Sequence, residues 1–149
     1  MIDEIDKKIL NILQTNGRIT NADLSRQINM APSAVLERMR RLELKKIIQK
    51  YTVSIDSHKV GVTLTAFIMI KSNGPVVDTK TAKEIGKIPE VQEVHIVAGE
   101  DCFLVKVKVA DTNSLNDLLR NKFGKIENIK STSTTIVLET IKESTKLTI

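Results

Sequence analysis

The chain of 149 residues has little cysteine, few aromatic residues and no long apolar run. Its single cysteine, Cys102, excludes an intrachain disulfide and a metal site built from several cysteines, and it fits a reducing compartment. With no tryptophan, one tyrosine and three phenylalanines, the chain lacks the aromatic platforms on which single-strand binders stack bases. No apolar run approaches the roughly 20 residues that cross a bilayer, and the start, MIDEIDKK, is acidic where a secretory signal is basic. We therefore expect a cytoplasmic protein with no membrane partner.

Basic residues outnumber acidic ones mainly in the first part of the chain. The sequence carries 23 Lys and Arg against 18 Asp and Glu, a formal charge of +5. Residues 1–60 hold 11 basic and 7 acidic side chains, whereas residues 61–149 hold 12 and 11. A local basic excess favours a polyanionic partner such as double-stranded DNA. At 41% hydrophobic content, the chain can form one good core or two small ones.

Residues 20–43 have the spacing of a helix-turn-helix. Thr20, followed three residues later by Asp23, is typical of a helix N-cap, and Asn29 tolerates the left-handed conformation of a tight turn. Pro32 suits the first position of a second helix, because its missing N–H would be unpaired there. A first helix over residues 2–14, capped by Asp3, completes a three-helix core. The same pattern also fits an amphipathic helix pair whose charged face is merely solvated.

The second helix of this pair has a polar face suited to a major groove. Val35, Met39 and Leu42 fall on the opposite, packing face. Lysines beyond the helix would contact phosphates, which fix register without reading sequence, although an ordinary solvated helix end is an alternative for this basic segment. The predicted DNA-binding residues are Ser33, Ala34, Glu37, Arg38, Arg41, Lys45, Lys46 and Lys50.

The rest of the chain alternates between strand and helix patterns. Strands are predicted over 63–71, 91–99, 101–111 and 129–141, and helices over 79–88 and from a Thr112 cap to about Gly124. This order predicts a ferredoxin-like sandwich, with two helices over one face of a four-stranded sheet. The fold class is therefore α+β. The expected domains are a helix-turn-helix domain at 1–50, a linker strand at 51–62 and a second domain at 63–149.

The face of this sheet away from the helices would be apolar. It would carry Phe67, Met69, Val97, Leu104 and Val137. An exposed apolar patch of this size is typical of an interaction surface. We therefore expect a dimer in which the two sheets pack face to face.

The turn between the two central strands is a candidate ligand site. Gly99 permits a close backbone approach, and Glu100 or Asp101 would pair with a ligand ammonium group. On the last strand, the run STSTT at residues 131–135 offers hydroxyls for a carboxylate. Turns are rich in Gly and Asp, and threonine is a good strand former, so a purely structural role remains open for the turn and for this run.

The residues give no positive indication of catalysis. The two histidines, His58 and His95, have no identifiable acid or thiol partners that would make a metal site or a general base. The sequence contains neither a phosphate-binding glycine loop nor a nucleophile elbow. We expect no cofactor and no metal.

Four blocks of sequence, taken in order, resemble the Lrp/AsnC family of prokaryotic transcription regulators. The blocks are IDEIDKKILNILQTNGRIT, LSRQINMAPSAVLERMRRLELKKIIQKY, AGEDCFLVKV and IKSTSTTIVLETIK. The resemblance implies an N-terminal helix-turn-helix, a C-terminal ferredoxin-like effector domain of the RAM type, and dimers that assemble into tetramers or octamers. It also implies an amino-acid effector, bound between subunits near Gly99, Glu100, Asp101, Thr132 and Thr134.

The chain departs from the family pattern at several positions. Ala31 stands where a serine usually caps the recognition helix, which removes about 1 kcal/mol of capping. Lys46 stands where a glycine usually closes the helix, and Lys50 stands where a glycine usually precedes the tyrosine; these lysines either cost helix-end geometry or add phosphate contacts. Cys102 replaces the aromatic residue that commonly follows the aspartate of the turn. Two alternatives to a sequence-specific regulator remain on this scaffold. One is an enzyme similar to siroheme decarboxylases, and the other is a chromosome-organising protein with little sequence preference.

Overall fold

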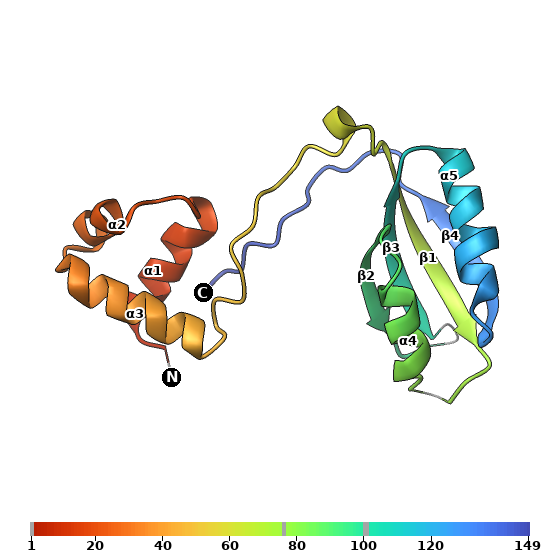
Figure 1. Ribbon diagram of the computed structural model, residues 1–149, viewed down its shortest axis with the longest axis horizontal. Helices are drawn as coiled ribbons and strands as arrows, with labels where there is room; N and C mark the ends of the chain where they lie inside the picture. Colours follow the sequence, from red (N-terminus) through yellow and green to blue (C-terminus); the bar gives the residue numbers. More distant parts are fainter. Residues whose placement is uncertain (1, 76, 100–101) are drawn as a thin grey trace. The chain divides into compact units, whose positions relative to one another are not determined.

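A computed structural model describes residues 2–75, 77–99 and 102–149 (Figure 1). The chain forms two compact units, each with its own core. The first comprises Met1–Ser54 together with Lys142–Ile149, and the second comprises Ile55–Ile141. The last eight residues thus belong with the N-terminal helices, although the sequence pattern assigns them to the second domain. Within the described ranges, no helix is both long and apolar enough to cross a membrane.

Three helices form the first unit: α1 (Glu4–Thr15), α2 (Asn21–Ile28) and α3 (Pro32–Leu44). Each helix is amphipathic and contributes to one small core, as the apolar spacing predicts. The helix-turn-helix is therefore confirmed as a fold. The residues of its buried core are Ile9, Leu10, Leu24, Val35 and Leu42.

The ends of these helices follow the predicted capping. The Asp3 side chain accepts a hydrogen bond from the Asp6 backbone N–H, and Thr20 accepts one from Asp23. Asn29 ends α2 in the left-handed conformation, with φ of 55°. The backbone N–H groups at the start of α3 receive no bond from the side chain of Ala31, as the missing serine implies.

The segment after α3 differs from the prediction in one respect. Lys46 adopts φ of 55°, a conformation that glycine takes more readily. The predicted linker strand at 51–62 is not formed, since none of these residues belongs to a strand within the described chain. A short 3₁₀ turn, η1 (His58–Val60), precedes the second unit.

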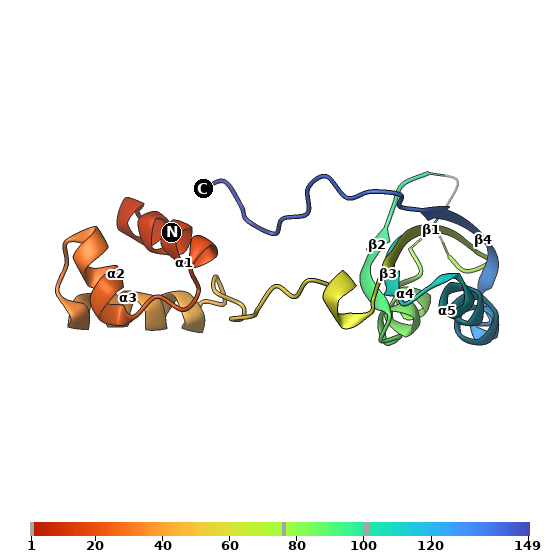
Figure 2. The ribbon, with the colours of Figure 1, turned by 90° about the horizontal axis from the view of Figure 1, so that it is seen from above.

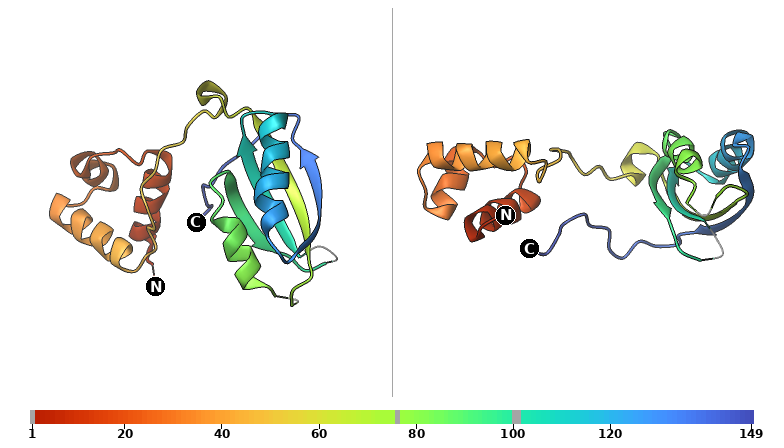
Figure 3. Two further views of the ribbon diagram at one scale, coloured as in Figure 1. Left: turned by 45° about the vertical axis from the view of Figure 1, so that its right-hand side comes forward. Right: turned by 90° about the horizontal axis from the view of Figure 1, so that it is seen from below.

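The second unit is a four-stranded antiparallel sheet with helices on one face, as Figures 2 and 3 show. The strands lie in the order β2-β3-β1-β4, so the chain-adjacent strands β2 and β3 pair and β1 lies beside both β3 and β4. This topology confirms the ferredoxin-like sandwich and the α+β class. Its elements are β1 (Leu64–Ser72), α4 (Thr79–Gly86), β2 (Val91–Ile96), β3 (Phe103–Val109), α5 (Thr112–Asp117), η2 (Leu118–Lys122), η3 (Phe123–Lys125) and β4 (Ile129–Ile136).

The core of this unit lies between the sheet and its helices. Alternate residues of β1 and β3 are fully buried there, and the intervening residues face the other way. The predicted alternation of Phe103, Val105 and Val107 with Lys106 and Lys108 is confirmed. Burial of these branched and aromatic side chains stabilises the packing of β3 and its neighbours β1 and β2 against the helices.

Several predicted element boundaries are wrong. The second strand ends at Ile96 rather than at residue 99, and the third covers Phe103–Val109 rather than 101–111. Asp111, not Thr112, caps α5, because its side chain accepts a 2.7 Å hydrogen bond from the Ser114 backbone N–H. The last strand ends at Ile136 rather than Ile141. The Val137 N–H still bonds to the Thr65 carbonyl at 2.9 Å. In this register Leu138 is opposite Leu64, the first residue of β1, so positions after Leu138 have no β1 residue opposite them.

Candidate DNA interface and ligand site

The exposed face of α3 presents several of the predicted DNA-binding residues. Ser33 and Glu37 are exposed, and Ala34 is half-buried. They lie on one side of α3, while Val35 and Leu42 are buried against α1 and α2 on the other. A short polar face at the start of such a helix is the part that reaches base edges in helix-turn-helix proteins.

Arg38 is held against the start of α1. Its Nη1 lies 2.7 Å from Asp3 Oδ2 and 2.8 Å from Asp6 Oδ1. The Arg38 side chain is only 22% exposed. These hydrogen bonds raise the pKa of Arg38, which therefore stays charged. The sequence pattern predicts Arg38 only as a DNA contact, whereas the structure gives it a second role in joining α3 to α1.

Arg41 shares the same acidic partner. Its Nη2 lies 3.0 Å and 3.1 Å from the two carboxylate oxygens of Asp6. Asp6 is 1% exposed, so its burial opposes ionisation. The hydrogen bonds from Arg38 and from the Asp3 backbone outweigh that penalty and hold the pKa of Asp6 below its usual value of 3.8. A buried carboxylate with two guanidinium partners fixes the orientation of α3 relative to α1.

Asp6 is the functional residue that the sequence reading missed. It lies three and four residues before Ile9 and Leu10, which places all three on the buried face of α1. An acidic residue on a buried face needs a cationic partner, and that signal was present in the sequence. The spacing along α1 does not say which of the three arginines at 38, 40 and 41 supplies the partner.

The basic segment after α3 is exposed at each predicted position. Lys45, Lys46 and Lys50 all lie at the surface. Beside them, the Tyr51 hydroxyl donates to Glu43 Oε1 at 2.9 Å. Partial burial and this carboxylate raise the pKa of Tyr51 to about 12, so the phenol remains a neutral donor that ties the segment to α3.

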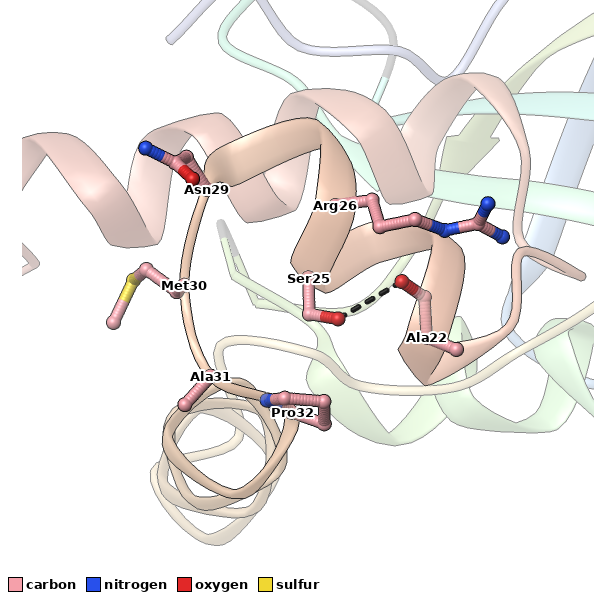
Figure 4. Close-up of a pocket in the computed structure, with 7 residues that line it drawn as sticks. All are labelled: Ala22, Ser25, Arg26, Asn29, Met30, Ala31 and Pro32. Atoms are coloured by element: carbon pink, nitrogen blue, oxygen red, sulfur yellow. Dashed lines mark hydrogen bonds between the residues drawn. The ribbon is translucent and has the colours of Figure 1, made fainter.

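A shallow open pocket of about 490 Å³ lies at the turn between α2 and α3 (Figure 4). Figure 4 shows Ser25 donating to the Ala22 carbonyl, at 2.8 Å, so that hydroxyl is already occupied. The cation in its lining, Arg26, forms an ion pair with Asp23. The pocket therefore offers little to hold a small molecule, and we assign no ligand to it.

The predicted ligand turn is partly described. Glu100 and Asp101 lie outside the described residues. Gly99 has φ of 154°, which residues with side chains rarely adopt, and a Cβ there would meet no atom of the described residues within 4 Å. The turn starts from a backbone pair in which the Val97 N–H donates to the Cys102 carbonyl at 3.0 Å. Among the described residues, the predicted ligand turn therefore has open space around Gly99.

The two predicted threonines lie at the same end of the sheet as this turn. Thr132 is opposite Ile70 of β1, and the Ile70 carbonyl accepts from the Cys102 N–H at 2.8 Å. Thr132 is thus two strand spacings, roughly 10 Å, from the start of β3. Thr134 lies opposite Ile68, one step along the strand. Residues directly opposite in a ladder share a face, so both threonines belong to the face that carries α4 and α5.

The opposite face of the sheet carries the predicted apolar patch. Phe67 is 36% exposed, and Met69, Val97, Leu104 and Val137 are each half-buried in the single chain. At the β2 edge of this face, Glu93 lies 3.2 Å from His95 Nε2 and 3.4 Å from Lys106 Nζ. The patch is therefore bordered on one side by charged residues, as protein interfaces are.

Each of the two units matches a known protein family. Residues 2–43 match the family model of the AsnC-type helix-turn-helix domain, and residues 65–147 match that of the Lrp/AsnC ligand binding domain. The leucine-responsive regulatory protein of Klebsiella pneumoniae is 36% identical over 150 residues, covering 99% of this chain and 92% of that protein. The protein of the same name from Escherichia coli K12 matches to the same extent.

Solved structures agree with this similarity. A transcriptional regulator from Neisseria meningitidis, crystallised as a complex with L-Met, has a TM-score of 0.92 and 29% identity, covering 99% of this chain and 97% of that one. The Mycobacterium tuberculosis feast or famine regulatory protein, complexed with L-methionine, has a TM-score of 0.90 and 31% identity over 99% of both chains. E. coli AsnC has a TM-score of 0.90 and 26% identity over 98% of both chains.

Proposed function

Since the chain belongs to the Lrp/AsnC family of transcription regulators, we propose that it binds specific DNA sites and that an amino acid alters this binding or the assembly of the protein. The observation that carries the proposal is the presence, in one chain, of a helix-turn-helix with an exposed polar face on α3 and of a matched ligand-binding domain. The relatives described above are regulators, which favours this function over a siroheme-decarboxylase-like enzyme.

On the DNA side, Ser33, Ala34 and Glu37 are the proposed base-reading positions. Arg38 and Arg41 are further proposed DNA contacts, and their bonds to Asp6 also hold α3 in place against α1. The lysines after α3 contact phosphates and supply affinity for any sequence. Two copies related by a two-fold axis would read half-sites about one helical turn apart. The proposed phosphate contacts are Lys45, Lys46 and Lys50.

On the ligand side, the proposed site is the turn at Gly99, with the carboxylates of Glu100 and Asp101 and the hydroxyls of Thr132 and Thr134. The two relatives solved with L-methionine support an amino acid as the effector class. An amino acid needs one anionic and one donor-rich group to bind its two charged ends, and this residue set offers both. We propose that the site forms between copies of the chain.

Self-association is proposed to begin at the apolar face of the sheet. Phe67, Met69 and Leu104 lie at its centre, and face-to-face packing of two such sheets would remove them from water. Larger assemblies, tetramers or octamers, would then place the turns of neighbouring dimers together.

A thermal-shift screen of the twenty amino acids tests the ligand proposal. A ligand bound only by the folded protein raises Tm, by an amount that grows with its concentration. Gly99→Ala should abolish the shift, because it forces a side chain into a disfavoured conformation at the site. Gly61→Ala is the matched control, since Gly61 also has positive φ and open space around it but lies in the turn after η1. No shift with any amino acid at millimolar concentration would contradict the proposal.

A further inference from the structure

The last residues of the chain pack along α1. We define the C-terminal segment as residues 144–149. Lys146 Nζ donates to Thr15 Oγ1 at 3.0 Å, and Asn11 Nδ2 donates to the Ile149 carbonyl at 3.1 Å. Residues 149 and 146 thus meet positions 11 and 15, so the segment runs antiparallel to α1. Figure 1 shows the end of the chain beside this helix.

Gln14 recognises the backbone of the segment at two points. Its Nε2 donates to the Leu147 carbonyl at 3.1 Å, and its Oε1 accepts from the Leu147 N–H at 2.6 Å. One side-chain amide therefore pairs with both polar groups of one residue, as a neighbouring strand would. Asn11, Gln14 and Thr15 share one face of α1, because they are spaced by three and four residues. This face is a docking surface for an extended peptide.

Apolar side chains become less exposed from the stretch after β4 to the C-terminal segment. Leu138 is 99% exposed and Ile141 is 86% exposed in the stretch that follows β4. Leu147 is 67% exposed and Ile149 is 42% exposed. The segment is therefore partly covered where it meets α1. Its hydrogen bonds lie at the surface, where each contributes little, so the contact can be made and released readily.

Docking of the C-terminal segment adds a second chain connection to the first unit. The chain leaves the first unit once, after Ser54, and re-enters it at Lys142. When the C-terminal segment is docked, two stretches of chain join the helix-turn-helix to Ile55–Ile141. When it is released, only one joins them.

We propose that the C-terminal segment is an intramolecular ligand of α1 and that its docking restrains the helix-turn-helix and couples it to the effector domain. The coupling to effector rests on the proposed function, whereas the docking and the restraint do not. Release leaves the helix-turn-helix free to reorient on a single linker. The segment thereby controls how strongly an event in the ligand-binding domain changes DNA affinity.

Three variants of the full-length protein test the docking. Gln14→Ala removes both bonds to Leu147, Gln14→Glu keeps the acceptor but loses the donor, and Gln92→Ala is the control, a glutamine exposed on β2. The readout is the hydrogen-exchange rate of residues 145–149. We expect exchange to quicken at least fivefold in Gln14→Ala, to a smaller extent in Gln14→Glu, and not in Gln92→Ala. Equal rates in all variants would overturn the docking.

The restraint is measured by time-resolved fluorescence anisotropy. A dye is attached at Gln27→Cys on α2, in a Cys102→Ser background, with and without Gln14→Ala. We expect release of the segment to add a faster rotational component. The change in DNA Kd on adding effector should fall at least fivefold in Gln14→Ala, while Kd without effector changes less than twofold.

The failures of the two proposals are distinguishable. Unchanged anisotropy on release overturns the restraint, whatever the effector does. An unchanged effector response in Gln14→Ala overturns the coupling. Absence of any effector response in the wild-type chain contradicts the proposed function and the coupling with it, while the exchange and anisotropy measurements still decide whether the segment docks and restrains.

Discussion

Asp6 is a buried acidic residue of α1 that two arginines of α3 share. Its carboxylate is buried, yet it stays ionised because Arg38 and Arg41 donate to it. A buried charge without its partners is strongly destabilising, so the three residues depend on one another. The orientation of α3 relative to α1 therefore depends on this small network as well as on the apolar core.

We predict that Asp6→Asn lowers the free energy of unfolding by about 2 kcal/mol at neutral pH, because charged hydrogen bonds from two arginines are lost. The folded-state pKa of Asp6 lies below 3.8, so its contribution is present above that pH and is lost as the pH falls through the lowered pKa. Urea unfolding from pH 7 to pH 2 should show a shallower acid dependence in Asp6→Asn than in wild type. The exposed Asp56→Asn variant controls for loss of a carboxylate in itself.

A second prediction concerns Lys46, which adopts φ of 55° after α3. Lys46→Gly should stabilise the fold by about 1 kcal/mol, because glycine adopts this conformation without strain. The matched control is Lys45→Gly, where φ is −76° and no such gain is available. If Lys46 contacts a phosphate, the same substitution should reduce the salt dependence of DNA binding by about one charge. If Lys46→Gly lost as much stability as Lys45→Gly, the claim that Lys46 is strained at this φ would be contradicted.

At the scale of elements, α3 has two roles: it presents the proposed DNA contacts, and through Arg38 it is joined to α1. Its sequence pattern does not separate these two roles. We predict that Arg38→Ala destabilises the fold by about 2 kcal/mol, because it leaves Asp3 and the buried Asp6 without a shared donor. Arg40→Ala, an exposed position on the same helix, should change stability by less than about 0.5 kcal/mol. Thermal unfolding measures both.

DNA binding of Arg38→Ala is then compared at a temperature where the variant is fully folded. We expect altered preference among operator variants, as the sequence predicts. Unchanged stability in Arg38→Ala would show that the ion pairs with α1 contribute nothing. Unchanged operator choice and affinity would show that Arg38 orients α3 without reading DNA.

The elements themselves were largely predictable from the sequence. Alternation in β3 and the cap signals at Asp3, Thr20 and Asn29 depend on residues close together in the chain, and local preferences decide them. The end of β4 was not predictable in this way, because it depends on where β1 begins. The cap of α5 was misplaced by one residue, because Asp111 and Thr112 are both good caps.

The candidate sites were predictable only in part. Which side chains share the exposed face of α3 follows from helical spacing. The pairing of Arg38 with Asp3 and Asp6 joins residues more than 30 positions apart. The local pattern of α1 indicates that Asp6 needs a cationic partner, but it does not identify that partner. The docking of the C-terminal segment on Gln14 is a contact of the same long-range kind.

At the scale of the whole molecule, self-association should depend on the open face of the sheet. We predict that Met69→Glu reduces the dimer to a monomer, because it places a charge at the centre of the apolar patch, opposite Leu104. Val77→Glu, at an exposed apolar residue between β1 and α4, is the control and should leave assembly unchanged. Sedimentation velocity distinguishes the species. A Met69→Glu dimer as tight as wild type would show that this face is not the interface.

The central claim is that one chain both reads a DNA sequence and senses an amino acid. Duplexes selected from a random pool by the wild-type protein supply the specific site, and a scrambled duplex of equal length supplies the control. The decisive measurement is Kd for each duplex at fixed salt, with and without the amino acid that raises Tm. We predict at least tenfold preference for the selected duplex and at least a fivefold change in its Kd on adding the amino acid. Equal affinity for both duplexes, or a Kd that the amino acid leaves unchanged in a protein whose assembly is also unchanged, would contradict the account.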